Sequence, residues 1–305
     1  MTQKPLHQAR NPRLEQLGRS LLRRFSQVSP ATASWIGFQL FATPLRDYYP
    51  IPTERTAILN QAQTAVIHTR IAGRQQRIQV YLWGPEDGQY PVASDAPTVL
   101  LVHGWMCTAA LMSGFVGPLR EAGFRVVAID GPAHGRSSGW QTNLRQFGEA
   151  IQAVGRQFGA LAGVVAHSFG GAAAVLLQHE CGGQPGTEWG RLVLASVPAE
   201  TKFMMHVIAQ AINASCEVEA DMQRRFLERY GEPIERFSIA QLAQGLEMPG
   251  LLLHDRDDGL IPFEQGEAIA QIWTEAEFVI TEGLGHSQIL HSPKVLQTVK
   301  EFLTR

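Results

Sequence analysis

The sequence LAGVVAHSFGGAAA at residues 161–174 joins an apolar run to a serine and then to a run of small residues. A continuous apolar run predicts a strand that is buried on both faces of a parallel sheet, and the small residues after it predict a helix. A serine at such a strand-to-helix turn needs small flanking residues. It also lies at the helix N-terminus, where free N–H groups favour negative charge. Ser168 is therefore the candidate nucleophile. Such a turn usually has glycine two residues before the serine, and here that position is occupied by another small residue, Ala166.

Short apolar runs and helical patterns also occur on both sides of this stretch. Other short apolar runs predict strands, at Thr98–Val102, Arg125–Ile129, Arg191–Ala195, Gly250–Leu253 and Glu277–Thr281, and a hairpin is predicted before them at Ala65–Arg70 and Arg77–Trp83. Helical patterns lie between most of these runs or after the last, at Ala109–Ala122, Asn143–Phe158, Gly170–His179, Glu264–Trp273 and Pro293–Leu303. This alternation predicts an α/β fold with a mostly parallel, doubly wound sheet.

Two additions to this sheet are expected. Residues 1–60 predict a helical N-terminal extension, and residues 61–305 predict the main domain. Within the main domain, residues at about 199–247 are too many for a simple crossover between strands. They carry two helical patterns, Phe203–Ala214 and Glu219–Tyr230. This interval therefore predicts a small helical cap inserted over the strand ends.

Two backbone N–H groups are candidates for binding an oxyanion. Parallel sheets place their chemistry at the carboxyl ends of the strands, and His103-Gly104-Trp105 follows the first apolar run. In acyl transfer the oxyanion needs two preorganised N–H donors. The candidates are the N–H of Trp105, which Gly104 allows to come close, and the N–H of Phe169, directly after Ser168. The alternative is a plain turn at the strand end, and His103 is expected to hold this loop.

An acid and a base are expected at the last two strand ends. HDRDDGLIP at residues 254–262 offers three aspartates, of which we prefer Asp258 over Asp255 and Asp257 as the partner that orients a histidine. GLGHS at residues 283–287 places His286 on a glycine-flanked loop, where it can reach a serine on another strand. A weaker candidate for the base is His291. The pair Asp130 and His134, in DGPAHGRS at residues 130–137, is expected to be structural.

From about residue 60 onward the chain resembles the α/β-hydrolase superfamily. The resemblance rests on HGW at 103–105, DGPAHGRS at 130–137, AHSFGG at 166–171, HDRDDGLIP at 254–262 and GLGHS at 283–287. The order Ser, Asp, His along the chain is the order that this scaffold imposes. The first sixty residues carry no motif that can be matched to the family.

The resemblance implies a serine hydrolase of the α/β-hydrolase fold that needs no cofactor and no metal. Ser168 would be the nucleophile, His286 the general base and Asp258 the acid, with the N–H groups of Trp105 and Phe169 as oxyanion hole. Our preferred hypothesis is a carboxylesterase that acts on a small-molecule ester with a small or medium apolar acyl group. The alternatives are an acyltransferase or perhydrolase, an amide or C–C bond hydrolase on the same triad, and a non-catalytic ligand-binding member of the fold.

The predicted cap contains a candidate acyl pocket. Met204 and Met205, with Val207 and Ile208 nearby, offer adaptable apolar side chains that could line it. The alternative is that these residues pack in the core of the cap.

Composition limits the partners. A net charge of −2 gives no reason to expect a nucleic-acid partner. Three cysteines, Cys107, Cys181 and Cys216, have neither a disulfide pattern nor zinc spacing. The apolar stretch at residues 31–42 is too short to cross a membrane, which takes about twenty residues. We therefore expect a cytoplasmic protein without an integral membrane segment, and its oligomeric state stays open. For the N-terminal extension, packing on the main domain is expected over a dimer or membrane contact.

Overall fold

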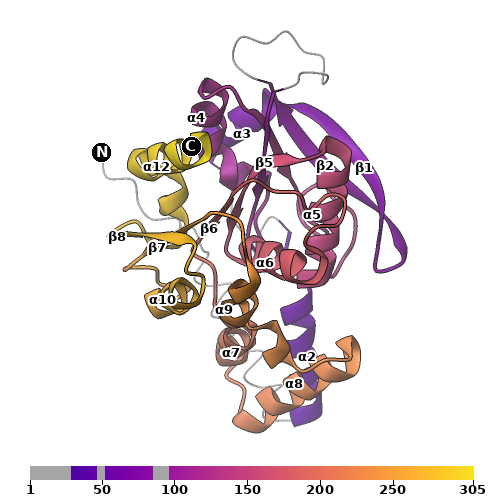
Figure 1. The fold of residues 1–305 in the computed structure, drawn as a ribbon. Helices are drawn as coiled ribbons and strands as arrows, with labels where there is room; N and C mark the ends of the chain where they lie inside the picture. The colour runs from indigo at the N-terminus through magenta and orange to yellow at the C-terminus, as the bar shows by residue number, and fades with distance from the viewer. Residues whose placement is uncertain (1–28, 47–51, 85–95) are drawn as a thin grey trace.

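The computed structural model describes residues 29–46, 52–84 and 96–305. Within them, eight strands form one sheet in the order β1-β2-β4-β3-β5-β6-β7-β8 (Figure 1). The strands are β1 Gln63–Ile71, β2 Arg74–Trp83, β3 Thr98–Val102, β4 Arg125–Ile129, β5 Leu161–His167, β6 Leu192–Ala195, β7 Gly250–Asp255 and β8 Ala276–Thr281. β2 runs antiparallel to β1 and β4, and the other neighbours pair in parallel. The expected mostly parallel sheet is therefore confirmed.

The central strands bury both faces, which is why they are continuous apolar runs in the sequence. Along β3, Leu100 and Val102 contribute to the hydrophobic core on one face of the sheet. Val99 and Leu101 contribute to the core on the other face. The edge strand β1 is mostly exposed, and its sequence is correspondingly more polar.

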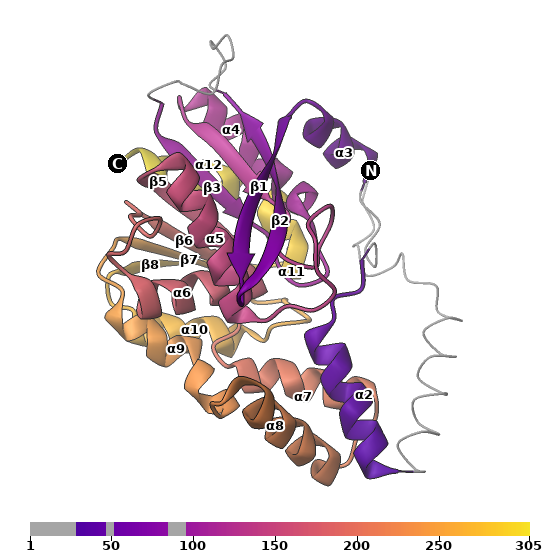
Figure 2. The same ribbon diagram turned by 90° about the vertical axis from the view of Figure 1, so that its right-hand side faces the viewer.

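Helices cover both faces of the sheet. On one face lie α5 Leu144–Phe158, α6 Phe169–Cys181 and α10 Phe263–Ile272. On the other lie α4 Val116–Glu121 and α12 Pro293–Thr304 (Figures 1 and 2). Asn143 caps α5, because its side-chain oxygen accepts the N–H of Gln146 at 2.9 Å. α5 therefore begins one residue later than its predicted start.

One predicted helix differs from the structure. The pattern at residues 109–122 predicts a single helix, but Ala109–Phe115 is a 3-10 helix and only Val116–Glu121 is α-helical. Pro118 has no N–H to donate to the carbonyl of Gly114, so a continuous α-helix would lack a hydrogen bond here. Gly114 also lies against the carbonyl oxygen of Leu290, which an added Cβ would approach to 2.6 Å. The chain therefore changes helix type at this point.

The residues between β6 and β7 form a helical layer over the end of the sheet. The longer elements are α7 Thr201–Ala211 and α8 Cys216–Tyr230, which we call the cap helices. A 3-10 helix at Ile234–Phe237, the short α9 Ile239–Leu242 and a 3-10 turn at Ala243–Gly245 lead back to β7. Both predicted cap patterns are helical, with α7 beginning and ending earlier than expected.

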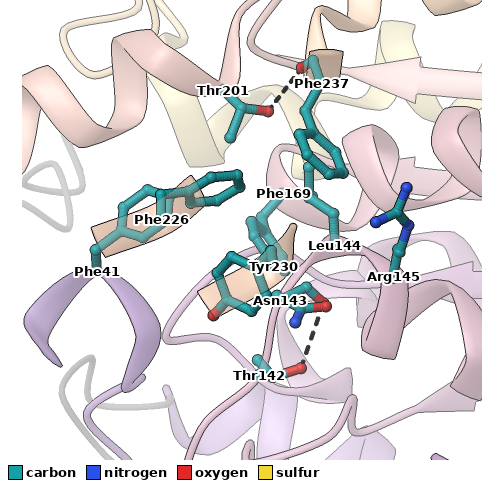
Figure 3. Close-up of a pocket in the computed structure, with 10 residues that line it drawn as sticks. All are labelled: Phe41, Thr142, Asn143, Leu144, Arg145, Phe169, Thr201, Phe226, Tyr230 and Phe237. Atoms are coloured by element: carbon teal, nitrogen blue, oxygen red, sulfur yellow. Dashed lines mark hydrogen bonds between the residues drawn. The ribbon is translucent and has the colours of Figure 1, made fainter. Parts of the chain in front are cut away.

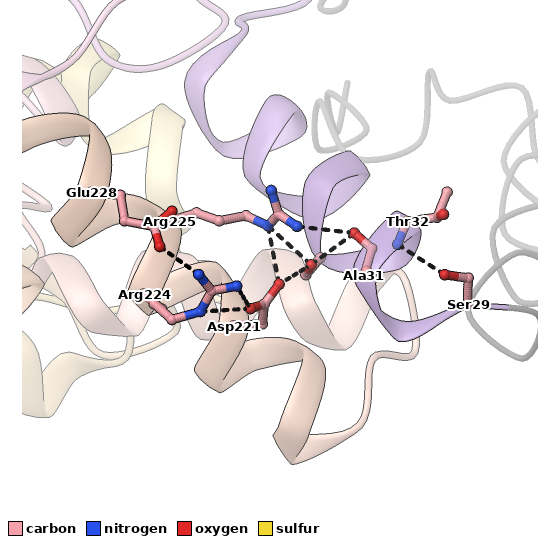
Figure 4. Close-up of polar contacts among 8 residues, drawn as sticks. Ser29, Ala31, Thr32, Asp221, Arg224, Arg225 and Glu228 are labelled. Atoms are coloured by element: carbon pink, nitrogen blue, oxygen red, sulfur yellow. Dashed lines mark hydrogen bonds and ion pairs between the residues drawn. The ribbon is translucent and has the colours of Figure 1, made fainter.

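The N-terminal helix α2 Pro30–Ala42 packs against both cap helices, as Figure 2 shows. Gly37 allows this approach, because an added Cβ would meet the sulfur of Met222 at 2.6 Å. Polar contacts join the same helices (Figure 4). The Asp221 carboxylate accepts the Ser34 hydroxyl, and Arg225 Nη2 donates to the carbonyl of Ala31 at 3.2 Å. The segment Arg13–Phe25, predicted as a helix, lies outside the described residues.

A second N-terminal helix, α3 Thr53–Asn60, lies on the main domain instead. It packs against the 3-10 helix Ala109–Phe115. The Trp83 indole N–H donates to the carbonyl of Ile58 at 3.3 Å, which ties α3 to the end of β2. Among the described residues no helix has both the length and the apolar character that a membrane crossing requires.

Candidate active site

Ser168 occupies a strained turn between β5 and α6. Its backbone has φ 51° and ψ −121°, a conformation that costs a non-glycine residue about 1–3 kcal/mol. Its neighbours must be small. A Cβ at Gly170 would lie 2.3 Å from the carbonyl oxygen of His103, and one at Gly171 would lie 2.3 Å from a methyl of Val197. The turn therefore places the serine side chain, which is only 5% exposed, at the helix N-terminus.

The loop after β3 runs directly beside this turn. A Cβ at Gly104 would lie 3.0 Å from the Cβ of Ser168, so glycine permits the close approach. The next residue, Trp105, donates its N–H to none of the hydrogen bonds found among the described residues. The N–H of Phe169 begins α6 and has no partner within that helix. Both expected oxyanion donors are thus free, on two segments that touch at Ser168.

Two buried histidines hold the loop that carries Trp105. His134 donates its Nδ1–H to the carbonyl of Pro132 at 2.8 Å and accepts the N–H of Met106 at Nε2, at 3.1 Å. His103 accepts the N–H of Gly131 at Nε2, at 2.9 Å. Burial lowers the pKa of His103 to about 4. Burial also lowers the pKa of His134, to about 3, and the neighbouring His103 ring adds to that shift. Both rings are neutral at neutral pH and act as loop supports, as the sequence suggests.

Asp130 supports the same region. Its carboxylate accepts the backbone N–H groups of Ala109 and Arg136, both at 2.9 Å, and the hydroxyl of Tyr81 at 3.1 Å. With these partners Asp130 fixes the turn after β4 against the 3-10 helix, and it lies away from the base candidate.

His286 and Asp258 are hydrogen-bonded to each other. His286 lies on the short helix α11 Gly285–Gln288, and its Nδ1 is 2.8 Å from Asp258 Oδ2. The other carboxylate oxygen of Asp258 accepts the N–H groups of Leu260 and Ile261, each at 2.9 Å. Burial alone would raise the pKa of Asp258, but these hydrogen bonds, that of His286 first, lower it to about 2. The carboxylate is therefore ionised and aimed at the imidazole.

The two other aspartates of this segment stabilise the loop that carries His286. Asp255 accepts the hydroxyl of Thr281 at 2.6 Å and the N–H groups of Leu284 and Gly285 at 3.1 and 2.9 Å. Asp257 accepts the N–H of Gly283 at 2.8 Å. Of the three candidates, only Asp258 contacts the histidine.

His167 is a neighbour of this pair that sequence reasoning missed. It is buried, and its Nε2 donates to the backbone carbonyl of His286 at 2.9 Å. The contact links the residue before Ser168 to the loop of the expected base. The only available signal was its position inside the AHSFGG motif. The weaker base candidate, His291, lies under Gly114 and does not line the cavity described next.

A cavity of about 430 Å³ opens at this point. Ser168, His286 and Trp105 all line it, although no hydrogen bond joins the Ser168 hydroxyl to the His286 ring among the described residues. Such contacts are often long in enzymes without bound substrate. Arg55 of α3 also lines the cavity, a contribution that sequence reasoning did not anticipate.

The apolar wall of the cavity comes from α7. Met204, Val207 and Ile208 lie three and four residues apart on one helix face and line it, as expected for Met204. The expectation for Met205 needs correction. It is fully buried in the hydrophobic core and is not part of the cavity lining. One residue along an α-helix turns the side chain by about 100°, which directs Met205 away from its neighbour's face.

Beside Phe169 lies a smaller aromatic cavity of about 40 Å³ (Figure 3). Phe169 separates the two spaces, since its ring lines the smaller cavity and lies 4.8 Å from the ring of Trp105. Phe41, Phe226 and Tyr230, from α2 and α8, close the far side. The described residues contain no group of three or more His, Cys, Asp or Glu side chains placed to hold a metal ion.

Comparison with known proteins agrees with this architecture. The model of the Alpha/beta hydrolase family matches residues 99–297. A bromoperoxidase from Bacillus anthracis is 15% identical, with a TM-score of 0.59 over 80% of this chain and 100% of its own. An esterase from Exiguobacterium antarcticum is 16% identical, with a TM-score of 0.57 over 79% and 99%. A meta-cleavage product hydrolase from Pseudomonas fluorescens is 15% identical, with a TM-score of 0.56 over 81% and 98%.

At these identities the likeness to solved structures shows the fold alone. The three structures are named as enzymes that catalyse different reactions. No curated protein sequence matches the chain.

Proposed function

Since the chain belongs to the alpha/beta hydrolase family, we propose that it is a serine hydrolase that cleaves a carboxylic ester through an acyl-enzyme on Ser168. One observation carries the proposal. The strained Ser168 opens into the same cavity as His286, whose Nδ1 is 2.8 Å from the buried carboxylate of Asp258. A serine, a base and an orienting acid on three different strand ends are the parts that nucleophilic acyl transfer requires.

In the proposed mechanism, His286 Nε2 accepts the hydroxyl proton of Ser168 while the serine oxygen attacks the ester carbonyl. Asp258 fixes the tautomer, because its carboxylate accepts the Nδ1–H and leaves Nε2 free to act as base. The developing oxyanion would accept hydrogen bonds from the N–H groups of Trp105 and Phe169.

Collapse of the tetrahedral intermediate breaks the C–O bond of the ester, and the leaving alcohol takes the proton from His286. Water then attacks the acyl-enzyme, gives its proton to His286, and the acid is released as Ser168 is protonated again. The contact between His167 Nε2–H and the carbonyl of His286 supports this role, since it fixes the base loop relative to the serine turn.

The apolar face of α7 supports an acyl group as the part of the substrate held in the cavity. Met204, Val207 and Ile208 present flexible and branched hydrocarbon side chains toward Ser168. An ester with a small or medium apolar segment fits this lining.

The test is the mass of the intact protein after treatment with a small fluorophosphonate, followed by a panel of esters of increasing acyl length. We expect one adduct on the wild-type protein and none on Ser168→Ala, with ester turnover reduced about 10⁴-fold or more. Ser196→Ala is the matched control, because Ser196 also follows a strand with a positive φ of 51° but is fully buried. It should keep the adduct. A folded wild-type protein that forms no adduct and turns over no ester would refute the proposal.

A further inference from the structure

Of the described residues that line the catalytic cavity, Arg55 is the one arginine or lysine. Arg55 is the third residue of α3, its side chain is partly buried, and it lines the same cavity as Ser168. Among the described residues its guanidinium forms neither a hydrogen bond nor an ion pair within 4.0 Å. A guanidinium has five N–H donors and stays protonated in proteins. This one is therefore charged and partly removed from water, and no described residue forms a hydrogen bond or a close ion pair with it.

None of the groups around Arg55 neutralises this charge. Burial raises the pKa of the Cys107 thiol to about 12 and lowers the pKa of His291 to about 4, so both are uncharged at neutral pH. Glu54 is exposed and attracts Arg55 through space, but the two side chains form no ion pair within 4.0 Å in the described part of the chain. Asp257 is the acidic residue that lines the cavity, and its exposed carboxylate accepts the N–H of Gly283.

The position of Arg55 is fixed by the fold. α3 is held by the Trp83 hydrogen bond to Ile58 and by its packing on the 3-10 helix that follows the oxyanion loop. A partly buried arginine without a partner costs desolvation and returns nothing to stability. An ionisable side chain that is perturbed by burial and lines a cleft is a candidate for binding a charged ligand.

We propose that Arg55 binds a carboxylate carried by the substrate, so that the preferred ester is one whose acyl part ends in a free acid. The inference rests on the proposed function, because it names the substrate class of the same site. Guanidinium and carboxylate match in a planar, two-bond geometry. One positive charge balances one negative charge, and apolar side chains such as Met204, Ile208 and Leu284 line much of the rest of the cavity, while the Asp257 carboxylate is engaged with the N–H of Gly283. A doubly charged phosphate monoester would keep an unbalanced charge there.

The experiment compares two nitrophenyl esters of one dicarboxylic acid. In one the far carboxylate is free, and in the other it is masked as a methyl ester. We expect the wild-type protein to favour the free acid, and Arg55→Gln to lower the ratio of the two kcat/KM values about 10- to 100-fold. Arg55→Lys keeps the charge and should retain part of the preference. Arg74→Gln, an exposed arginine on the β1–β2 hairpin, is the matched control and should change neither value.

Binding separates this inference from the proposed function. Calorimetry on Ser168→Ala needs no turnover, and it should show that the free-acid half-ester binds at least about 10-fold tighter than the masked one. Adding Arg55→Gln should remove that difference. If it does so while the wild-type protein cleaves no ester, the carboxylate site stands and the esterase proposal fails.

Other outcomes would overturn the inference about Arg55. If both esters are cleaved with a ratio that Arg55→Gln leaves unchanged, or if the double variant still prefers the free acid, the inference is overturned and ester hydrolysis stands. Tighter binding of methyl phosphate than of the half-ester would overturn the assignment to a carboxylate. A thermal unfolding curve for Arg55→Gln that matches the wild-type curve shows that these outcomes concern binding.

Discussion

Replacing Gly170 by alanine should impair both the fold and the position of the proposed nucleophile, Ser168. The added Cβ would lie 2.3 Å from the carbonyl oxygen of His103 and 2.8 Å from a methyl of Val102. Ordinary contact begins at 3.4 Å, so the shortfall is about 1 Å. The nearer neighbour is backbone at the end of β3 and cannot rotate away. The N-terminus of α6, with Ser168 and Phe169, must move by a comparable distance.

Such a shift gives two measurable effects. Overpacking of this kind costs about 1–3 kcal/mol of unfolding free energy. A displacement of about 1 Å at reacting groups costs about 100-fold in rate. We expect Gly170→Ala to show both, with urea unfolding reporting the first and kcat/KM on an ester cleaved by the wild-type protein reporting the second.

A second glycine provides the control. Gly117 lies in α4, and an added Cβ there would meet no atom within 4 Å. Gly117→Ala should therefore leave activity unchanged and raise stability by up to about 1 kcal/mol. If Gly170→Ala unfolds at the wild-type urea concentration and keeps wild-type kcat/KM, the packing argument for the turn is wrong.

Other predictions concern two buried titratable side chains and the N-terminal helix α2. Because burial lowers the pKa of His103 from 6.5 to about 4, the unfolded chain binds a proton that the fold excludes, and stability falls as pH drops from 6.5 toward 4. His103→Gln should lose less unfolding free energy than the wild-type protein between pH 7 and pH 5. Asp258→Asn should reduce kcat about 10⁴-fold with the circular dichroism spectrum unchanged, because an amide NH2 would replace the oxygen that faces His286 Nδ1 and would favour the wrong tautomer. Retained activity would contradict the pairing. Asp221→Asn should speed amide hydrogen exchange in residues 30–42 and leave β3 unchanged, whereas Glu228→Gln on the same helix face should have no effect in that segment.

The sheet could be predicted closely from the sequence because burial on both faces leaves no ambiguity. Thr98–Val102 and Arg125–Ile129 are strands with the predicted bounds, and the other parallel strands differ by at most two residues. The order of the strand ends also placed Ser168, Asp258 and His286 as candidates, since chemistry lies at the carboxyl edge of such sheets. The hydrogen bond between the last two agrees with that expectation, and the catalytic roles remain predictions.

What the sequence could not predict depends on contacts between distant segments. An apolar helix at residues 31–42 indicates a buried face but does not say which element covers it. Likewise, the pair Met204 and Met205 suggests a lining without saying which side chain faces the cavity. Arg55 belongs to a segment that no motif marks, and the packing of α3 on the 3-10 helix Ala109–Phe115 brings it to the cavity. The order of residues along the chain does not show which distant segments pack against each other.

The pairing of α2 with α8 has a consequence for synthesis of the chain. Asp221 follows its partner Ser34 by 187 residues. At about 5–20 residues per second, the ribosome needs roughly 10–40 s to make the intervening chain. During that interval α2 has left the exit tunnel, but the helices that cover its apolar face do not yet exist. The nascent chain therefore carries an uncovered apolar segment during that interval, and α2 can pack on the cap helices only after six of the eight described strands have been made.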